Sequence, residues 1–496
     1  MISMSIQLLN TLSKKKETLQ PLNDNTVSMY CCGVTPYSNT HIGHTRTFFS
    51  YDLLHRTLVD NGYVVHWARN ITDVDDKIIN RANAEHISCE ELVSRYVIEQ
   101  NETLEKFHLQ RPEFEPKVTE NILQIINLIE ILIQKNDAYT TNSGVYFRVR
   151  NFKDYGKLSK NKIDALKQGA RIEVDETKED ALDFALWKLT KPGEIFWDSP
   201  WGAGRPGWHV ECSAMIHSLF GDSIDIHMGG RDLIFPHHEA EIAQSEAATG
   251  KPLANLWLHA GMVTLYGEKM SKSTNHYVGI RDFLTKYPSE VLRLVFLSVA
   301  YAQPLDFTFE LATENFKKLA KIYRFVSLLD IYERQTDAFS EGKVEFSEDV
   351  FLKLEGLIEH MRQHVRDDLN STAALAVFFE FIKETNSKIA KMEKAQARLS
   401  KADVHRLKVQ WPQFKKWISC SLGLLEQTPQ DFFAGLSAYN LGGEISAKEI
   451  EAKIMQRNEA RQNKDWKQSD VLRDELLGHG IQIQDTPSGT RWTVVI

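Results

Sequence analysis

Near the N-terminus, hydrophobic and polar positions repeat first with the period of a strand and then with that of a helix. The apolar run at residues 26–32 predicts a short buried strand, and residues 63–67 predict a second one. Between them, residues 41–62 carry apolar side chains at helical spacing, and Asn61 and Gly62 are expected to end that helix. Strand, loop, helix and strand in this order predict half of a doubly wound sheet, in which ligands bind beyond the carboxyl ends of the strands.

The pattern changes several times along the rest of the chain. Residues 120–225 combine a helix, short strands and a loop-rich stretch, which predicts an insertion into the sheet domain. From residue 309 to about residue 425, apolar side chains form helical stripes, and the last residues contain a charged helix and two strand-like segments. The predicted fold is α/β: a Rossmann-like, doubly wound parallel sheet with an insertion, then a helical bundle and a small mixed α/β domain. The predicted units are residues 1–119 and 226–308 for the two halves of the sheet domain, 120–225 for the insertion, 309–425 for the bundle, 426–446 for a linker and 447–496 for the last unit.

Composition agrees with a globular protein of several domains. The 496 residues correspond to three or four domains of about 150 residues each. The five cysteines are few and irregularly spaced, which favours a reducing compartment and thiols that act as ligands or nucleophiles. The sequence shows neither a signal peptide nor a long uncharged run, so we expect a cytoplasmic protein.

The net charge of −8 argues against a general nucleic-acid binder. One stretch differs, because residues 383–416 contain ten Lys and Arg against three Asp and Glu. That stretch fits either the solvated face of a helix or a surface that contacts phosphates.

Two short motifs carry groups suited to nucleotide phosphates. His41-Ile42-Gly43-His44 falls where the first helix is expected to begin, so its imidazoles and the helix N–H groups suit phosphate oxygens. Far later, Lys269-Met270-Ser271-Lys272-Ser273 supplies two positive charges and two hydroxyl donors. Alone, these motifs also fit a polar helix start and a basic loop. Together and in this order they resemble the paired signatures of the class I aminoacyl-tRNA synthetases, which implies ATP-dependent adenylate chemistry.

A third group of residues could bind a metal ion. If Pro236 starts a helix, His237 and Glu241 point to one face of it, and Cys32 and Cys212 add two thiols. Taken alone, buried thiols and a capped helix are the commoner explanation of such residues, because the sequence spacing does not bring them together. Cys31 and Cys32 are not expected to serve together, since neighbouring strand residues point to opposite faces.

The chain resembles the cysteinyl-tRNA synthetase family over residues 25–496. The resemblance rests on seven stretches, of which the third and fourth are the most distinctive. They are MYCCGVTPYSNTHIGHTRTF, RNITDVDDKI, SPWGAGRPGWHVECSAM, DIHMGGRDLIFPHHEAEIAQSEA, LHAGMVTLYGEKMSKS, DDLNSTAAL and KDWKQSDVLRDELLGHGIQIQDTPSGTRW.

This resemblance implies an ATP-dependent ligase that activates L-cysteine as cysteinyl-adenylate and transfers it to tRNA(Cys). In that family a zinc ion binds the thiolate of the substrate, which implies one zinc ion per chain here. A metal prefers the soft thiolate to a serine hydroxyl, so a separate editing site would be unnecessary. The implied zinc ligands are Cys32, Cys212, His237 and Glu241.

The resemblance also implies roles for residues around the substrates. Trp208 fits plain core as well as a substrate contact, and Asp232 suits the ammonium group of cysteine. Magnesium is expected with ATP, although Asp73, Asp75 and Asp76 are interpreted as loop carboxylates that cap helices. The implied catalytic residues are His41, His44, Lys269 and Lys272; those for ATP are Gly33, His41, Gly43, His44 and Lys272; and those for cysteine are Thr72, Trp208, His209 and Asp232.

In the last unit the resemblance implies recognition of the GCA anticodon, by Arg461, Trp466, Asp470 and Asp485. On their own these residues read as a solvated helix surface. The basic stretch then becomes easier to interpret as part of a tRNA surface. We expect a monomer whose partners are tRNA(Cys), L-cysteine and ATP, and no membrane.

The chain departs from the family pattern in a few places. Residues 274–276 are Thr-Asn-His after the second motif, Met228 and Arg231 interrupt a glycine-rich run, and Ala240 replaces an Asn. These changes bear on loop dynamics more than on the reaction. Two other functions are considered: a ligase that joins activated cysteine to an amino-sugar in mycothiol synthesis, and a catalytically silent tRNA-binding relative. The first lacks the anticodon unit, and the second would have lost signature residues.

Overall fold

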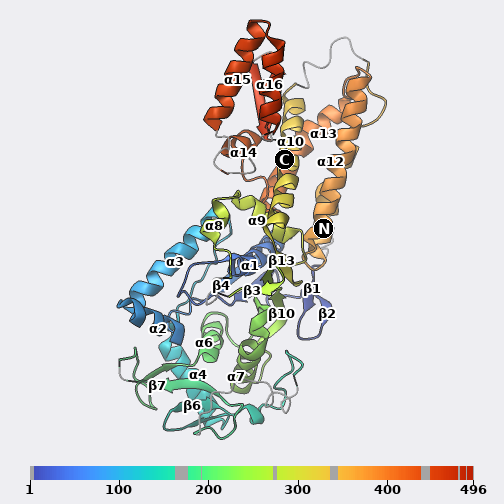
Figure 1. Cartoon of the computed structure of the whole chain (residues 1–496). Helices are drawn as coiled ribbons and strands as arrows, with labels where there is room; N and C mark the ends of the chain where they lie inside the picture. Colours follow the sequence, from blue (N-terminus) through green and yellow to red (C-terminus); the bar gives the residue numbers. More distant parts are fainter. Residues whose placement is uncertain are drawn as a thin grey trace.

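The computed structural model describes residues 5–161, 177–191, 193–271, 276–335, 344–436, 439, 447–478, 481–486 and 489–494. At its centre lies a parallel four-stranded sheet with the order β10-β9-β3-β4 (Figure 1). The predicted Rossmann-like parallel sheet is therefore confirmed. Its strands and the helices that join or cover them are β3 (Thr26–Cys31), α1 (Ile42–Asp60), β4 (Val64–Arg69), α6 (Trp208–Phe220), β9 (Ile224–Gly230), α7 (Glu239–Thr249) and β10 (Ala254–Ala260).

This sheet separates two hydrophobic cores. Cys31 packs into the core that contains α1 and the helical bundle, whereas Cys32 packs into the core that contains α6 and α7. The two neighbours point to opposite faces because side chains alternate along an extended chain. The thiol of Cys32 therefore faces α6 and α7, and that of Cys31 does not.

Within the residues predicted as an insertion, four strands form an antiparallel sheet with the order β5-β6-β7-β8. Figure 1 shows this sheet at the end of the molecule opposite the helical bundle. Asp76 at the start of α2 forms ion pairs with Lys188 and Arg205, which tie the sheet to the segment after β4. The elements are α2 (Asp76–Glu85), α3 (Cys89–Lys106), α4 (Ile122–Gln134), β5 (Ala138–Thr140), β6 (Gly144–Phe147), β7 (Phe184–Leu189) and β8 (Gly204–Pro206).

After β10 the chain forms a small three-stranded sheet with the order β12-β11-β13. Its strand β12 carries the first residue of the second motif. Helices α8 and α9 lie between β12 and β13 in the chain and pack into the core on the α1 side. The elements are β11 (Val263–Leu265), β12 (Glu268–Lys269), α8 (Ile280–Leu284), α9 (Ser289–Leu297) and β13 (Leu305–Phe307).

The helical bundle begins with the stripe that the sequence predicted in residues 309–335. Phe316, Leu319 and Ile322 on that stripe are at most 1% exposed. One helix, α14, falls within the predicted linker, whose residues 437, 438 and 440–446 lie outside the described part of the chain. No helix in the described residues is long and apolar enough to cross a membrane. The elements are α10 (Phe309–Gln335), α11 (Leu357–Arg366), α12 (Ser371–Lys394), α13 (Lys401–Leu422) and α14 (Pro429–Gly435).

The C-terminal unit has two helices, and the prediction of a single charged helix is wrong. Lys464 between them has a positive φ of 62°, and the side chain of Asp465 accepts a hydrogen bond from the backbone N–H of Gln468. This turn is built from charged residues, so it resembles the helices on either side in composition. The elements are α15 (Ala447–Gln462), α16 (Trp466–Gly478), β14 (Ile481–Thr486) and β15 (Gly489–Val494).

The N-terminal hairpin of β1 (Gln7–Asn10) and β2 (Lys15–Thr18) was not predicted. Its second strand is polar and largely exposed, so no alternation of apolar residues marks it. The backbone N–H of Thr11 donates to the carbonyl of Trp257 at 2.8 Å, which attaches the hairpin to β10.

Candidate active site

The first motif forms the N-terminus of α1, as predicted. His41 is the N-cap residue, and its Nδ1 accepts a hydrogen bond from the backbone N–H of Gly43 at 3.1 Å. The rings of His41 and His44 stack with their centroids 3.7 Å apart. The helix end therefore presents two adjacent imidazoles together with the positive end of the helix dipole, which suits a phosphate group.

The two motifs meet in space although they are far apart in the chain. A Cβ atom added to Gly43 would lie 2.9 Å from the Cε of Met270, so a side chain at this position would displace its neighbour. The backbone N–H of Ile42 donates to the carbonyl of Val278 at 3.2 Å, which connects the start of α1 to the chain just after the second motif. The structure thus brings the imidazoles and the basic motif to one end of α1.

Within the second motif, the structure describes residues up to Ser271. Lys269 ends β12 and is exposed, whereas Lys272, Thr274 and Asn275 lie outside the described residues. The backbones of Ser271 and His276 exchange two hydrogen bonds, at 2.8 and 2.9 Å. The imidazole Nε2 of His276, which departs from the family pattern, lies 3.0 Å from the carbonyl oxygen of Leu265.

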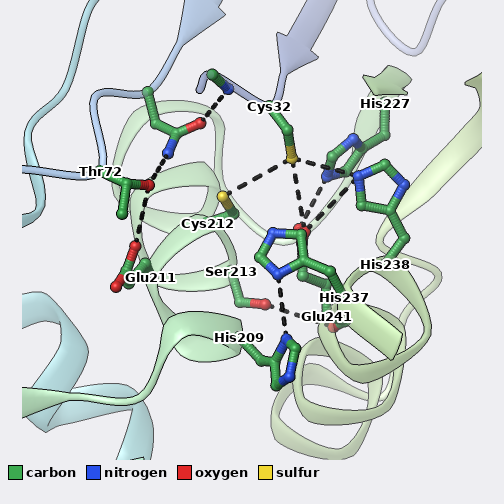
Figure 2. A network of polar contacts seen from close by, with 12 residues as sticks. Cys32, Thr72, His209, Glu211, Cys212, Ser213, His227, His237, His238 and Glu241 are labelled. Carbon is green, nitrogen blue, oxygen red and sulfur yellow. Dashed lines mark hydrogen bonds and ion pairs between the residues drawn. The ribbon is translucent and has the colours of Figure 1, made fainter. Parts of the chain in front are cut away.

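The four side chains that were candidates for metal binding converge beyond the carboxyl end of the sheet (Figure 2). The Sγ atoms of Cys32 and Cys212 lie 3.9 Å apart, and Nε2 of His237 lies 2.9 Å from Oε1 of Glu241. One ligand atom of each residue lies within 4.8 Å of those of the other three, and all four residues are buried. We call this group the buried centre.

The buried centre is assembled from three elements and one turn. Cys32 follows β3, Cys212 lies on α6 and Glu241 on the first turn of α7. As predicted, helical backbone angles start at Pro236: within the π-type turn Ile234–His238 only Phe235 departs from them, and the turn continues directly into α7. Phe235 has extended backbone angles, the conformation that a following proline favours. The turn still places His237 within reach of Glu241.

The donor set of the buried centre fits a zinc ion. Two thiols, an imidazole and a carboxylate are ligands that zinc accepts, in tetrahedral geometry. With Zn–S bonds of about 2.3 Å, a tetrahedron separates two sulfur ligands by about 3.8 Å. The observed separation of 3.9 Å between Cys32 and Cys212 agrees with that value.

Burial and mutual contacts shift the pKa values of all four groups in the buried centre. Burial raises the pKa of the Cys32 thiol well above its ordinary value, whereas the hydrogen bond with Cys32 lowers the pKa of the Cys212 thiol to about 6. Burial opposes charge on Glu241 and His237 too, but the attraction between carboxylate and imidazole outweighs it. The pKa of Glu241 lies well below its ordinary value, and that of His237 rises to about 10.

Three further histidines behind the buried centre were not selected from the sequence. Nε2 of His227 lies 2.8 Å from Oε2 of Glu241, and Nδ1 of His238 lies 2.8 Å from Nε2 of His259. Strand alternation could have identified His227. It pairs with Tyr30 on β3, and Tyr30 points to the same face as Cys32, two residues later. His238 and His259 had no comparable signal.

Two residues expected near the amino acid lie beside the buried centre. Trp208 stacks on the ring of His237 with a centroid distance of 4.3 Å and is 39% exposed, so the interpretation as plain core is wrong. Nδ1 of His209 lies 3.1 Å from Nδ1 of His237, and burial lowers the pKa of His209 to about 3. Asp232 lies in the short turn after β9 and is exposed.

Thr72 takes part in a chain of buried hydrogen bonds. Its Oγ1 donates to Oε2 of Glu211 at 3.3 Å and accepts from Nδ2 of Asn70 at 3.0 Å. Oδ1 of Asn70 accepts in turn from the backbone N–H of Gly33 at 2.8 Å. A Cβ atom on Gly33 would lie 1.9 Å from the backbone oxygen of Asn70, so this close approach requires glycine. Burial raises the pKa of the Glu211 carboxyl well above its ordinary value.

The three aspartates after Thr72 have structural partners. Asp75 caps α2 by accepting from the backbone N–H of Lys77, as predicted. Asp73 instead accepts from the hydroxyl and the N–H of Thr119, and Asp76 forms the ion pairs with the insertion. The interpretation as helix caps therefore holds for one of the three.

In the C-terminal unit, Asp485 is held by two arginines. Arg457 donates to it twice, at 2.9 and 3.0 Å, and Arg461 once, at 2.5 Å. These hydrogen bonds hold the pKa of Asp485 well below its ordinary range. Asp470 forms an ion pair with Arg473, one helical turn later, at 3.3 Å. The side chain of Trp466 is 60% exposed. Asp485 thus orients Arg461, while Trp466 presents an open ring face.

Much of the positive charge in the basic stretch 383–416 is paired with carboxylates. The N···O distances of these pairs lie between 2.7 and 3.5 Å. This pairing favours the interpretation of residues 383–416 as the solvated face of a helix over their interpretation as a surface that contacts phosphates. The pairs are Lys391 with Glu348, Arg398 with Glu345, Arg406 with Glu355 and Lys415 with Asp330.

Three parts of the chain match known protein families. Residues 18–317 match the tRNA synthetases class I (C) catalytic domain. Residues 360–426 match the DALR domain, and residues 447–492 match the cysteinyl-tRNA ligase anticodon binding domain. The first match covers the sheet domain and the insertion, including both motifs and the buried centre.

Similar proteins extend over the whole chain. The cysteine–tRNA ligase of Thermodesulfovibrio yellowstonii is 44% identical over 99% of this chain and 100% of its own length. That of Ectopseudomonas mendocina is 44% identical over 99% of both chains. Among solved structures, a Mycobacterium tuberculosis methionyl-tRNA synthetase with methionyl-adenylate has a TM-score of 0.60 at 15% identity, covering 80% of this chain and 92% of its own, a likeness of fold. The chain therefore belongs to the cysteine–tRNA ligase family of class I tRNA synthetases.

Proposed function

We propose that the chain activates L-cysteine with ATP as cysteinyl-adenylate and then transfers the cysteinyl group to tRNA(Cys). The observation that carries this proposal is the position of the buried centre, beyond the carboxyl ends of β3 and β9, where the chain after Cys32 leads to the N-terminus of α1. Because the amino acid site and the nucleotide site share one edge of the sheet, the carboxylate of cysteine can reach the α-phosphate of ATP.

Residues at the start of α1 would hold the triphosphate. His41 and His44 would donate to it from their imidazoles. Gly33 and Gly43 pack closely against Asn70 and Met270, and their backbone would lie beside the nucleotide. Lys269 and Lys272 would stabilise the charge that develops on the α-phosphate and on the departing pyrophosphate. The chain needs no general base for this step, because the substrate carboxylate is already ionised at neutral pH.

A zinc ion held by Cys32, Cys212, His237 and Glu241 would bind the sulfur of the substrate and lower the pKa of its thiol. Trp208 on the ring of His237 would close one side of the amino acid site, and His209 would orient His237. Asp232 would face the ammonium group from the turn after β9.

The C-terminal unit would recognise the anticodon of tRNA(Cys). Arg461, oriented by Asp485, can donate to a base edge, Asp470 can accept from a base amino group, and the exposed ring of Trp466 can stack on a base. The presence of this unit supports a tRNA substrate over an amino-sugar as the acceptor. We also propose that the chain acts as a monomer and that its domains have the boundaries predicted from the sequence.

Amino-acid-dependent exchange of labelled pyrophosphate into ATP tests the proposal. The full-length chain is expected to catalyse this exchange with L-cysteine and not with L-serine, and to charge tRNA(Cys). Exchange at equal rates with serine would contradict the role of a metal in selection, and no exchange with cysteine would contradict the adenylate step.

A further inference from the structure

The segment that carries the second motif is attached to the start of α1 at both of its ends. It runs from Gly261, just after β10, through β11 and β12 to Ile280, where α8 begins. A buried charged side chain takes part in each attachment, Arg46 of α1 at the first end and Glu99 of α3 at the second. A buried charge costs free energy unless its hydrogen bonds are made, so each side chain should hold its partners firmly.

Arg46 lies two residues after the first motif and binds the turn that follows α9. Its Nη2 donates to the carbonyl oxygens of Ala300 at 3.0 Å and Gln303 at 2.9 Å. Gly261 packs against the same turn: its N–H donates to the carbonyl of Tyr301 at 2.8 Å, and a Cβ atom on it would lie 2.0 Å from the oxygen of Gln303. The turn leads into β13, which pairs with β11. Arg46 therefore holds the support on which the second-motif segment begins.

Glu99 holds the other end through Thr40, which directly precedes the first motif. The carboxylate accepts from the hydroxyl of Thr40 at 2.9 Å and from its backbone N–H at 3.1 Å. The carbonyl of Thr40 accepts from the N–H of Ile280 at 3.3 Å. Two residues further along, the N–H of Ile42 donates to the carbonyl of Val278 at 3.2 Å. The start of α1 is thereby paired with the chain just after the second motif.

We propose that Arg46 and Glu99 are positioning residues that hold the lysines of the second motif at a set distance from the imidazoles of the first. This inference rests on the proposed function, because it takes both motifs to contact one ATP molecule. If one attachment were lost, the lysines would move relative to the α-phosphate while the end of α1 stayed in place. A displacement of about 1 Å can slow a reaction about a hundredfold, so neither side chain needs to touch a substrate to affect the rate.

Cysteine-dependent pyrophosphate exchange by the full-length chain tests the first attachment. Arg46→Met removes the donors but keeps a long apolar stem, and kcat should fall about ten- to a hundredfold. Arg46→Lys keeps a charged donor and should recover most of this loss. The matched control is Arg56→Met, because Arg56 is also buried on α1 but binds the carbonyls of Ser419 and Cys420 near the other end of the helix. Exchange by this control should be unchanged at a temperature at which all variants are folded.

Two variants of Glu99 test the second attachment. Glu99→Leu removes both acceptor oxygens and should lower kcat to a similar extent as Arg46→Met. Glu99→Gln keeps an oxygen with two lone pairs, which can accept from both the hydroxyl and the N–H of Thr40, and it should restore exchange. Thermal unfolding, measured on each variant, gives the temperature range in which the rates are compared.

A double variant shows whether the attachments act through the second motif. Arg46→Met should cost less activity in a chain that already carries Lys272→Ala, because one of the groups that Arg46 positions is then missing. The combined loss should fall about tenfold short of the product of the two single losses. If Arg46→Met does not fold, Glu99→Leu takes its place in this comparison.

The opposite results would overturn the inference. A combined loss equal to the product would mean that Arg46 acts without the second motif, and equal losses in Arg46→Met and Arg56→Met would mean a general weakening of α1. Full exchange in both Arg46→Met and Glu99→Leu would overturn the inference and leave the proposed function intact. A wild-type chain without exchange would overturn the proposed function itself.

Discussion

The buried centre and the C-terminal unit hold their polar side chains in opposite settings. In the buried centre, Cys32, Cys212 and His237 are at most 4% exposed, and Glu241 is fully buried. In the C-terminal unit, Trp466 is 60% exposed and lies on the surface of a unit of two helices and a hairpin. The buried centre removes its polar groups from water, whereas the C-terminal unit leaves Trp466 in contact with water.

This difference predicts where substitutions act. A buried polar group without its partner costs free energy, so the members of the buried centre depend on one another and on the zinc ion that we propose they hold. An exposed side chain that loses its partner is solvated by water instead. Changes in the buried centre should therefore alter metal binding and chemistry together, and changes in the C-terminal unit should alter RNA binding alone.

The largest effect is expected at Cys212. Cys212→Ala should remove the zinc ion and reduce cysteine-dependent pyrophosphate exchange by about a thousandfold or more, because a transition-state contact and the substrate site are lost together. Metal analysis and exchange assays measure both. Cys31→Ala is the matched control, since Cys31 is equally buried but on the opposite face of the sheet. A variant of Cys212 that keeps one zinc ion and full exchange would refute the ligand assignment.

A smaller effect is expected at Lys272, which tests whether ATP chemistry is separable from the metal. Lys272→Ala should reduce exchange by about a hundredfold, the size of a lost electrostatic contact in the transition state, while the zinc content stays unchanged. Lys251→Ala removes an exposed lysine of the same half of the sheet domain and serves as the control. Unchanged exchange in Lys272→Ala would count against the role of the second motif.

Deletion of residues 447–496 tests the comparison from the other side. The shortened chain should exchange pyrophosphate at the full rate, because the proposed ATP, cysteine and zinc residues all lie outside this unit. Charging of tRNA(Cys) should fall by about tenfold or more, which is the loss of affinity expected when contacts to one or two anticodon bases are removed. Equal loss of exchange and charging would mean that the two regions do not act separately.

The smallest effect is expected at Asp485. Asp485→Asn leaves the size of the side chain unchanged but weakens its hold on Arg457 and Arg461, so Arg461 becomes less well oriented. The KM for tRNA(Cys) should rise about three- to tenfold, with kcat and the KM for cysteine unchanged. Steady-state charging at varied tRNA concentration measures this. An increase in the KM for cysteine would contradict a role confined to RNA.

Sequence patterns predicted the elements around the candidate site well, and they failed where backbone geometry depends on distant contacts. The helix after residue 41 and the opposite faces of Cys31 and Cys32 follow from local periodicity, and the structure confirms both. The N-terminal hairpin was missed, because its second strand is polar and exposed and the hairpin is held by a hydrogen bond to the distant strand β10. The charged turn at Lys464 was missed because its composition matches that of the helices beside it.

The chemical identity of the groups in the buried centre was readable from the sequence, since thiols, imidazoles and carboxylates are fixed by residue type and the family resemblance selected among them. Their separations depend on the packing of β3, α6 and α7, which local periodicity does not describe. The partners of Thr72 and the contact of His227 with Glu241 were likewise decided by the tertiary structure. Hydrogen bonds between segments far apart in the chain form only when hydrophobic burial has already brought those segments together, so no local pattern records them.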